Sequence, residues 1–381
     1  GAGVNVSRVV GRRGGRDRGP TLVCIAGMHG NEPAGVRALE AVFDRLAAEH
    51  LSVDGWFVGL IGNRAALAAG RRFLREDLNR VWVPERLADL EQGPAGLSGE
   101  SLEQAELATE LRPLLNGLAG RTFLLDLHTT SAPGPPFVLL EDTLPNRAFA
   151  LRFPVPVILG VDERLRGTLV HHACARGATA IGFEAGQHDD QASVGRAEDA
   201  VWIALGALGL VAGSTRVDRA RQRLERARSA LPRYAELRHR HPVGPTDAFE
   251  MRPGFANFDA VTAGEAVATS RRGPVTAPES GLLLMPLYQQ QGEDGFFLIR
   301  AVRPIWLRLS SWLRRLRAER YLHWLPGVSR HPDRPRAFVV DRHTARWRAV
   351  ELFHLLGFSC VATDDGEIIV TRRRNDEVPD G

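Results

Sequence analysis

Residues 21–32 read Thr-Leu-Val-Cys-Ile-Ala-Gly-Met-His-Gly-Asn-Glu, an apolar run that ends at once in polar side chains. An uncharged run of this length is typical of a strand buried on both faces of a sheet. A helical pattern follows, with apolar residues at Val36, Leu39, Phe43 and Leu46. A buried strand followed directly by an amphipathic helix predicts the first unit of an α/β fold.

Apolar strands and helical stretches go on alternating through the N-terminal half of the chain. Strands are expected over 55–62, 121–128, 136–140, 156–160 and 178–184, and helices over 101–115 and 192–210. Ser101 and Gln104 are spaced as a capping box for the first of these helices. Strands that are apolar throughout and separated by helices predict a mostly parallel sheet flanked by helices, with functional side chains at the carboxyl ends of the strands.

The composition changes twice in the second half. The sequence predicts four parts: an α/β domain at 1–215, an arginine-rich helical connector at 216–240, a small all-β domain at 241–302, and a C-terminal α+β extension at 303–381. The extension opens with apolar residues at helical spacing among arginines, and ends in a strand, helix, strand, strand pattern over 337–371. A helix packed on its own domain explains the first pattern better than a membrane surface does.

Charge and cysteine content exclude several classes of protein. All 49 basic residues of the 381 are arginines, the net charge is only +4, and the arginines are spread along the chain, which argues against nucleic-acid binding. No apolar run is long enough for a membrane span, and the first residues carry no secretory pattern. Three cysteines in apolar contexts predict buried thiols and a cytoplasmic protein. The sequence leaves homo-oligomerisation open.

Two imidazoles and a carboxylate follow predicted strands. His29 and Glu32 are three positions apart after the first strand, and His128 ends the strand of residues 121–128. A set of two histidines and one carboxylate binds zinc and leaves a coordination position for water, as catalytic zinc sites do. We therefore predict one Zn²⁺ per chain. A buried histidine satisfied by hydrogen bonds is the alternative for His29 taken alone.

Further polar residues are placed to support that centre. Asp126 lies two residues before His128, on the same side of the strand, where it can accept a proton from the far nitrogen of a ligating histidine. Asn79 and Arg80 end the loop of residues 71–80, and together could clamp a substrate carboxylate. A solvated charged loop is the alternative interpretation.

Glu184 is an isolated carboxylate at the end of the apolar strand Ile181-Gly182-Phe183. Apolar surroundings raise the pKa of a carboxyl group, which suits a group that takes a proton from water and returns it to a leaving amine. We expect Glu184 to be the general base. A structural ion pair with an arginine is the alternative.

Four motifs together resemble one known family. Gly-x-His-Gly-Asn-Glu, Asp-Leu-Asn-Arg, Asp-Leu-His-Thr-Thr and Phe-Glu-Ala-Gly-Gln occur in an order and at spacings similar to those of the succinylglutamate desuccinylase/aspartoacylase family, within the zinc-carboxypeptidase-like (M14-type) group. The resemblance covers about residues 5–302, and includes the Gly-Leu-Leu-Leu-Met-Pro run of the β-domain. The final eighty residues have no counterpart in it.

The resemblance implies roles for individual residues. It gives His29, Glu32 and His128 as zinc ligands and Glu184 as general base and acid. It also implies that Arg72 polarises the scissile carbonyl, that Asn79 and Arg80 hold a substrate carboxylate, that Tyr288 contacts substrate, and that the β-domain caps the site. One departure is Arg64 after Asn63, where many family members have proline. Because that change alters the pocket wall, the substrate cannot be copied from one relative.

The predicted function is a zinc-dependent amidohydrolase that cleaves the amide bond of a small N-acyl amino acid, with no nucleic-acid or membrane partner. A metallocarboxypeptidase acting on a peptide or a modified C-terminus would use the same metal and clamp. A binding protein without enzymatic activity is the third hypothesis. The complete ligand set argues against it.

Overall fold

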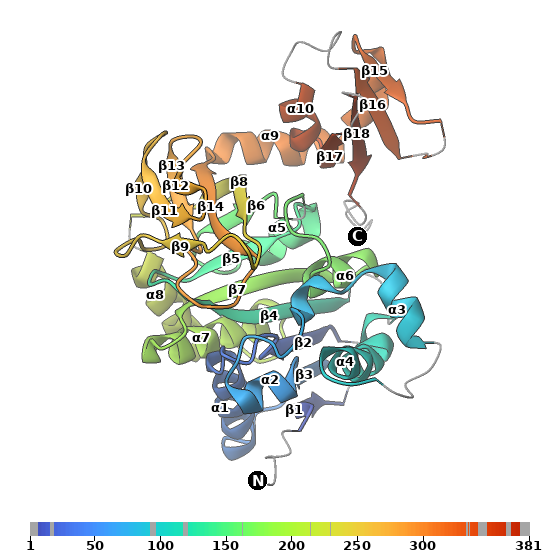
Figure 1. Cartoon of the computed structure of the whole chain (residues 1–381). Helices are drawn as coiled ribbons and strands as arrows, with labels where there is room; N and C mark the ends of the chain where they lie inside the picture. Colours follow the sequence, from blue (N-terminus) through green and yellow to red (C-terminus); the bar gives the residue numbers. More distant parts are fainter. Residues whose placement is uncertain are drawn as a thin grey trace.

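The computed structural model describes residues 7–15, 19–91, 97–116, 121–161, 163–213, 215–228, 230–332, 334, 336–341, 349–362 and 367–373. Within these residues an eleven-stranded sheet forms the centre of the molecule, in the order β1-β3-β2-β4-β7-β5-β6-β8-β14-β13-β10 (Figure 1). The strands of its N-terminal part are β1 (Val9–Gly14), β2 (Thr21–Ala26), β3 (Trp56–Ile61), β4 (Thr122–Thr130), β5 (Phe137–Leu140), β6 (Val157–Leu159) and β7 (Thr179–Gln187).

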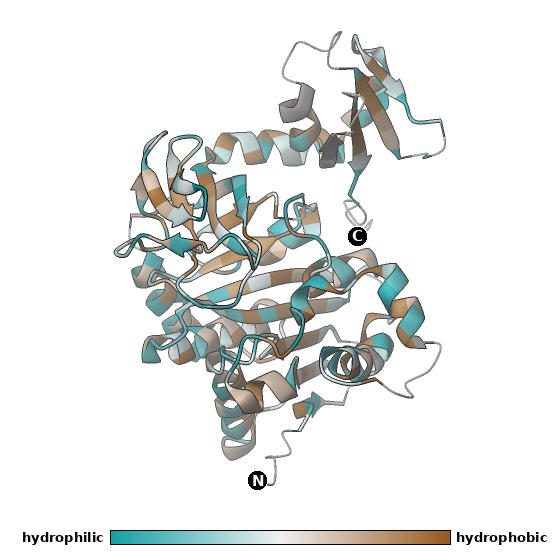
Figure 2. Cartoon of the chain, in the orientation of Figure 1, coloured by the Kyte–Doolittle hydropathy of each residue, from teal (hydrophilic) through white to brown (hydrophobic). Residues whose placement is uncertain are grey.

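The predicted mixed α/β class with a parallel sheet centre is confirmed. Strands β3, β2, β4 and β7 are parallel neighbours, whereas β1 runs antiparallel to β3 and β5 runs antiparallel to β7. The central strands are buried along nearly their whole length, and Figure 2 shows β4 and β7 in the colours of apolar residues. Their mostly apolar sequences thus reflect cover on both faces of the sheet.

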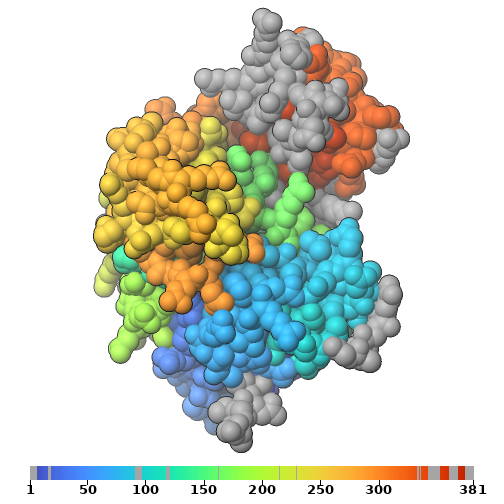
Figure 3. Space-filling model, viewed as in Figure 1, coloured from blue at the N-terminus to red at the C-terminus, as the bar shows by residue number. Residues whose placement is uncertain are grey.

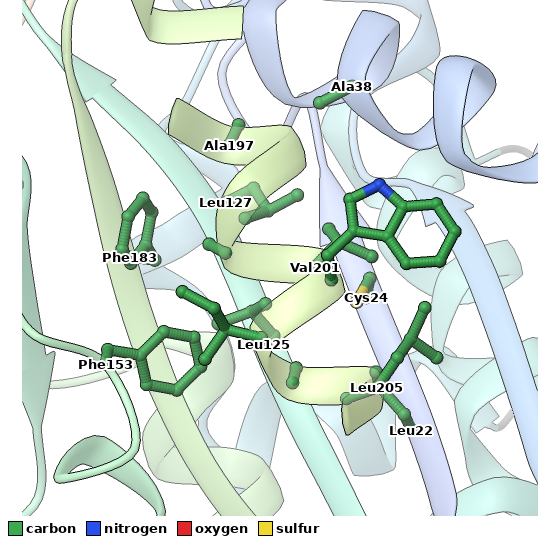
Figure 4. Packing of buried hydrophobic residues seen from close by; sticks show 14 of the residues in the cluster. Leu22, Cys24, Ala38, Leu125, Leu127, Phe153, Phe183, Ala197, Val201 and Leu205 are labelled. Atoms are coloured by element: carbon green, nitrogen blue, oxygen red, sulfur yellow. The ribbon is translucent and has the colours of Figure 1, made fainter. Parts of the chain in front are cut away.

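Helices supply that cover. On one face lie α1 (Ala34–Ala48), α7 (Gln191–Ala207) and α8 (Thr215–Arg228). Figure 4 shows Val201 and Leu205 of α7 packed against Leu125 and Leu127 of β4 in the largest apolar cluster. On the other face lie α4 (Glu100–Leu115) and α6 (Leu169–Ala175), with α3 (Pro84–Glu91) packed on α4. The shorter helices are α2 (Arg64–Ala69), the 3₁₀ turn η1 (Leu78–Arg80) and α5 (Leu144–Ala150).

The capping box expected at α4 does not form. Gly99 is the N-cap residue of this helix and contributes no side chain. Ser101 instead accepts a hydrogen bond from Arg86, and Gln104 donates to the carbonyl of Val81. The two side chains tie α4 to the preceding segment because tertiary partners compete with local capping.

The connector expected to be helical over 216–240 is helical only as far as Arg228. Residues Tyr234–Pro242 form strand β8, which pairs in parallel with β6 and antiparallel with β14. Ala235 and Leu237 alternate as buried residues along it, a period of two that the many charged neighbours obscured in the sequence. The β-domain therefore continues the main sheet through β8.

The remaining strands form the predicted small all-β domain, which is called the β-module from here on. Its strands are β9 (Glu250–Met251), β10 (Ala260–Val261), β11 (Ala266–Ser270), β12 (Gly273–Thr276), β13 (Gly281–Leu284) and β14 (Asp294–Ala301). Strands β14, β13 and β10 extend the main sheet, and β12, β11 and β9 form a second one. In Figure 3 the orange surface near residue 290 lies against the blue loop near residue 75, where the side chain of Gln291 donates to the carbonyl of Phe73.

The C-terminal extension forms a separate four-stranded sheet in the order β15-β16-β18-β17. Its elements are α9 (Pro304–Arg315), η2 (Ala318–Trp324), β15 (Val328–Arg330), β16 (Ala337–Asp341), α10 (Ala349–Leu355), β17 (Phe358–Ala362) and β18 (Glu367–Arg372). The strand, helix, strand, strand pattern over 337–371 thus matches the prediction. No helix in the described ranges has both the length and the hydropathy needed to cross a bilayer.

Candidate active site

A tight turn at the carboxyl end of β2 presents His29 and Glu32. Gly27 adopts a positive φ of 66°, which favours glycine. At Gly30, a Cβ atom would lie 2.0 Å from the backbone carbon of Ala66, so only glycine permits this approach of two backbone segments. The Gly30 amide also donates to the carbonyl of Arg72 at 3.1 Å. The glycines of the motif therefore position the turn against the loop that precedes η1.

Strands β4 and β7 present the other two groups. His128 and Glu184 are register partners on these parallel neighbours, so their backbones lie one strand spacing apart, about 4.8 Å. Both belong to the sheet end at which β2 releases His29 and Glu32. Three motifs far apart in the sequence thus meet at one edge, because parallel strands end at the same side of a sheet.

His29, Glu32 and His128 form a buried cluster with one ligand atom of each within 4.8 Å of the others. Nδ1 of His29 lies 2.8 Å from Oε1 of Glu32, and Nδ1 of His128 lies 3.0 Å from Oε2 of the same carboxylate. The three side chains predicted as ligands are therefore brought together, with both Nδ1 atoms turned toward the carboxylate.

The far nitrogen of each imidazole faces a second carboxylate. Nε2 of His128 lies 2.9 Å from Oδ2 of Asp126, in the arrangement expected from the sequence. Nε2 of His29 lies 3.0 Å from Oδ1 of Asp77, a residue the sequence analysis did not single out. Asp77 is the N-cap of η1 and also accepts from the amide of Asn79. Asp77 is the first residue of the Asp-Leu-Asn-Arg motif, and this position is the sequence signal that could have identified it.

The electrostatics of the cluster fit a divalent cation. Burial by itself raises the pKa of Glu32, but His29 and His128 outweigh it and hold that pKa well below its usual range. Burial lowers the pKa of His128, but Asp126 and Glu32 reverse the effect and raise the pKa well above its usual range. Positive charge is thus strongly favoured between these carboxylates, and two imidazoles with a carboxylate are borderline donors that suit zinc.

Glu184 lies beside this cluster with different surroundings. Its side chain is buried, and its Oε2 has no hydrogen-bond partner among the described residues. Burial raises the pKa of Glu184 to about 8, although His128 and Arg72 act to lower it. A buried carboxyl group of this kind exchanges protons near neutral pH.

Arg72 reaches the cluster from the loop before η1. One terminal nitrogen donates to Oδ2 of Asp77 at 3.0 Å, and the other lies 3.5 Å from Oε1 of Glu32. The guanidinium lines the cavity in front of the cluster. It therefore holds a positive charge at the cavity wall beside Glu32 and Asp77.

Asn79 and Arg80 also line the cavity, but their polar atoms are largely engaged within the protein. The Asn79 side-chain oxygen accepts from the amide of Leu169 at 2.9 Å. Arg80 donates from one terminal nitrogen to the Asn79 carbonyl at 2.9 Å, and from the other to Oδ2 of Asp294 at 2.8 Å. Asp294 of the β-module thus accepts a hydrogen bond from Arg80, the arginine that was expected to hold a substrate carboxylate.

Tyr288 does not line this cavity. Its hydroxyl donates to the carbonyl of Arg252 at 2.6 Å, within the β-module. The flanking residues Leu287 and Gln289 line the cavity in its place. The hydroxyl of Tyr288 is thus bound within the β-module, and the residue is not part of the cavity wall.

A polar network that the sequence analysis missed joins the β-module to the turn that carries His29 and Glu32, called here the metal loop. Gln289 Oε1 accepts from the side chain of Asn31 at 2.7 Å and lies 3.0 Å from Nε2 of His188. Nδ1 of His188 lies 2.7 Å from the hydroxyl of Thr129, next to His128. No local pattern marks these residues, since their partners come from three distant segments.

Comparison with known proteins identifies the domain. Residues 18–193 match the family model described as the succinylglutamate desuccinylase/aspartoacylase catalytic domain. These residues belong to that family. The predicted family is confirmed, and its catalytic domain contains all the residues of the candidate metal cluster.

Curated relatives of this succinylglutamate desuccinylase/aspartoacylase domain match over short stretches. Succinylglutamate desuccinylase of Pseudomonas aeruginosa is 38% identical over 116 residues, which is 30% of this chain and 33% of the relative. That of Pseudomonas paraeruginosa is 39% identical over 69 residues, or 18% of this chain and 21% of the relative. The matches thus span a third or less of these relatives' length.

Solved structures extend the likeness in fold. Succinylglutamate desuccinylase from Vibrio cholerae is 20% identical with a TM-score of 0.53, covering 75% of this chain and 82% of that one. The succinylglutamate desuccinylase/aspartoacylase structure from Rhodobacter sphaeroides is 18% identical with a TM-score of 0.57, covering 76% and 87%. At these identities the likeness establishes the fold alone.

Proposed function

We propose that the chain is a zinc-dependent amidohydrolase that cleaves the amide bond of a small N-acyl amino acid. The observation that carries the proposal is the buried cluster of His29, Glu32 and His128, with an unpartnered carboxyl oxygen of Glu184 beside it. Membership of a family whose named members are desuccinylases supports a deacylase. The proposal assigns the ligand role to the cluster and proton transfer to Glu184.

When bound, zinc supplies a Lewis acid that activates water and polarises a carbonyl. Glu184 accepts the proton of the attacking water at Oε2 and later delivers it to the leaving nitrogen. Arg72 stabilises negative charge on the former carbonyl oxygen, and an interaction of this type contributes about 3 to 4 kcal/mol. Asp77 and Asp126 fix the orientation of the two imidazoles, so that both Nδ1 atoms face the carboxylate of Glu32, and these three side chains would hold the ion.

The β-module supports a small substrate. Its residues Met285, Leu287 and Phe297 line the cavity opposite the catalytic strands, and the polar network of Gln289 holds the module against the metal loop. An extended peptide would need that rim to open. If peptides of increasing length were better substrates than N-acyl amino acids, metallocarboxypeptidase activity would replace this proposal.

A hydrolysis screen with N-acetyl, N-formyl and N-succinyl amino acids, with and without a chelator, tests the proposal. We expect release of free amino acid that stops with chelator and returns with added zinc. Mass spectrometry of the native protein should find one zinc per chain. Hydrolysis that is indifferent to the chelator, or a metal-free protein that cannot be loaded, would contradict it.

The same proposal places the protein in the cytoplasm. The side chains of Cys24 and Cys174 are buried, as expected of cysteines in a protein of a reducing compartment. The side chain of Cys360 lies outside the described residues.

A further inference from the structure

The cavity in front of the metal cluster carries an excess of negative charge. It holds about 1000 Å³ of space, part of it open to solvent. Six carboxylates line it, namely Glu32, Asp126, Glu141, Glu184, Glu293 and Asp294. Only two guanidinium groups, those of Arg72 and Arg80, line it as well. Even with a divalent ion and one protonated carboxyl group, the formal charge stays negative. A polyanionic substrate such as succinylglutamate meets repulsion there.

The two arginines offer little compensation, because both already serve protein carboxylates. Arg72 donates to Asp77, and Arg80 donates to Asp294, whose other oxygen is paired with Arg240. A substrate carboxylate would have to compete with buried partners for these terminal nitrogens. The pocket therefore favours a neutral or positively charged substrate.

Glu141 marks one end of the cavity. It follows β5, which runs antiparallel to β7 with Phe137 opposite Glu184. Four residues at strand spacing place the Glu141 backbone about 13 Å along the sheet from the level of Glu184. Leu139 and Gly182, a register pair on the two strands, line the cavity between these ends. An apolar path thus leads from the reacting centre to a carboxylate.

The Glu141 carboxylate has one oxygen available for a ligand. The side chain is buried, with 7% of the residue exposed. Its Oε2 lies 3.2 Å from Nδ1 of His171, whose side chain is 49% exposed. Its Oε1 has no hydrogen-bond partner among the described residues. A buried carboxylate that lacks a full set of partners attracts a cation.

We propose that the substrate carries a second, positively charged amino group on an alkyl chain, and that Glu141 binds this ammonium. The inference rests on the proposed amide hydrolysis, because it names the amine part of the same substrate. The acyl group lies at the metal cluster, the alkyl chain lies over Gly182 and Leu139, and the ammonium lies at Glu141. N-acylated diamino acids and N-acylated diamines share this chemistry.

Substrates that differ only at the chain end test the inference. Nα-acetyllysine, Nα-acetylnorleucine and Nα-acetyl-aminoadipate present an ammonium, a methyl group and a carboxylate at similar reach. We expect kcat/KM to fall in that order, with about tenfold or more between the first two, as a hydrogen bond between charged groups gives. N-acetylcadaverine, which lacks the α-carboxylate of the lysine derivative, distinguishes diamines from diamino acids.

Variants assign the preference to Glu141. Glu141→Gln should reduce the preference for the lysine over the norleucine derivative to about twofold or less, while kcat/KM for the norleucine derivative stays close to wild type. Glu40→Gln on the exposed face of α1 removes the same charge away from the cavity and should retain the full preference. Thermal unfolding of each variant checks that the fold is kept.

A binding measurement separates this inference from the proposed function. By calorimetry on zinc-loaded and metal-free protein, cadaverine should bind wild type at least about tenfold more tightly than Glu141→Gln, and pentanol, which has no ammonium, should show no such difference. Equal turnover of the three acetyl amino acids, or preference for the aminoadipate derivative, would overturn the inference and leave amide hydrolysis standing. If neither these compounds nor the N-formyl and N-succinyl amino acids of the screen are hydrolysed, the proposed function fails, and cadaverine binding alone decides on Glu141.

Discussion

Two buried glutamates of the site differ in the charge state that their neighbours favour. Glu32 lies between two imidazoles, which hold its pKa well below the usual range. Glu184 is buried, its Oε2 has no hydrogen-bond partner among the described residues, and burial raises its pKa to about 8. The first is therefore suited to a permanently ionised metal ligand and the second to a group that gains and loses a proton.

Replacement of Glu184 tests this division. Glu184→Gln keeps the shape of the side chain and removes its ability to accept a proton. We expect kcat to fall at least about a hundredfold, the contribution typical of a general base, while zinc content stays at one per chain. Steady-state kinetics and metal analysis by mass spectrometry measure both. Near-normal turnover in this variant would remove the assignment.

Asp77 offers a second test at the level of one residue. Asp77→Asn retains the size of the side chain but weakens its hold on Nε2 of His29. We expect zinc affinity to fall about ten- to a hundredfold, as for other carboxylates behind a ligating histidine. Competition with a chromophoric chelator measures the change.

The matched control for this test is Asp89→Asn, on an exposed position of α3. It should leave zinc affinity unchanged. Equal affinities for the Asp77→Asn variant and wild type would show that the imidazole is oriented without its carboxylate partner.

At the scale of elements, the polar network of Gln289 couples the β-module to the metal loop. Gln289→Leu removes the acceptor that Asn31 and His188 share and puts an apolar side chain of similar size in its place. We expect KM to rise about two- to tenfold, the effect of one or two hydrogen bonds, with little change in kcat. Tyr288→Phe, on the neighbouring residue, loses its hydrogen bonds to the Arg252 carbonyl and the Phe255 amide, away from the cavity, and serves as the control. A kcat effect as large as the KM effect would place Gln289 in the chemical step instead.

Whole strands and helices could be predicted from the sequence where one pattern dominated. The mostly apolar runs of β2 and β4 indicated buried parallel strands, because the alternation of apolar and polar residues is lost when both faces of a strand are covered. Strand β8 was missed, since Arg238 and Arg240 suggested a solvated helix although Ala235 and Leu237 alternate. Its strand character depends on β6 and β14, which are supplied only by the fold.

Across the whole molecule, a buried carboxylate joins the C-terminal extension to the catalytic domain. Arg147 and Arg314 both bind Asp142, and Arg314 Nη2 lies 2.8 Å from its Oδ2. Asp142 directly follows Glu141, so α9 contacts the segment that ends the cavity. The extension therefore supports the wall on which the proposed ammonium site depends.

Arg314→Met should weaken this contact. It removes one charged partner of Asp142 and leaves Arg147, so we expect a loss of about 1.5 to 3 kcal/mol in the stability of the docked extension. Limited proteolysis should then release the C-terminal part faster than in wild type. Arg315→Met, at the neighbouring exposed position, is the control and should not change the rate.

The same contact predicts a pH dependence. Burial raises the pKa of Asp142, but Arg147 and Arg314 outweigh it and hold the pKa far below the usual range of an aspartate. A lowered folded-state pKa means that the stabilisation is fully present above about pH 4 and is lost as the pH falls toward the folded-state value. Unfolding measured from pH 6 down to pH 3 should show this loss, and Asp142→Asn should abolish that part of it.

The sequence by itself determined the fold class, the family and the cluster of His29, Glu32 and His128. These depend on short motifs at strand ends, and parallel strands bring such ends together without further information. Only the tertiary structure decided that Asp77 contacts Nε2 of His29, that Asp294 is paired with Arg80, and that Glu141 lines the cavity. Each of these depends on side chains from segments with no fixed spacing in the sequence. Tertiary packing brings such partners together, and the helix or strand periodicity of the sequence does not indicate them.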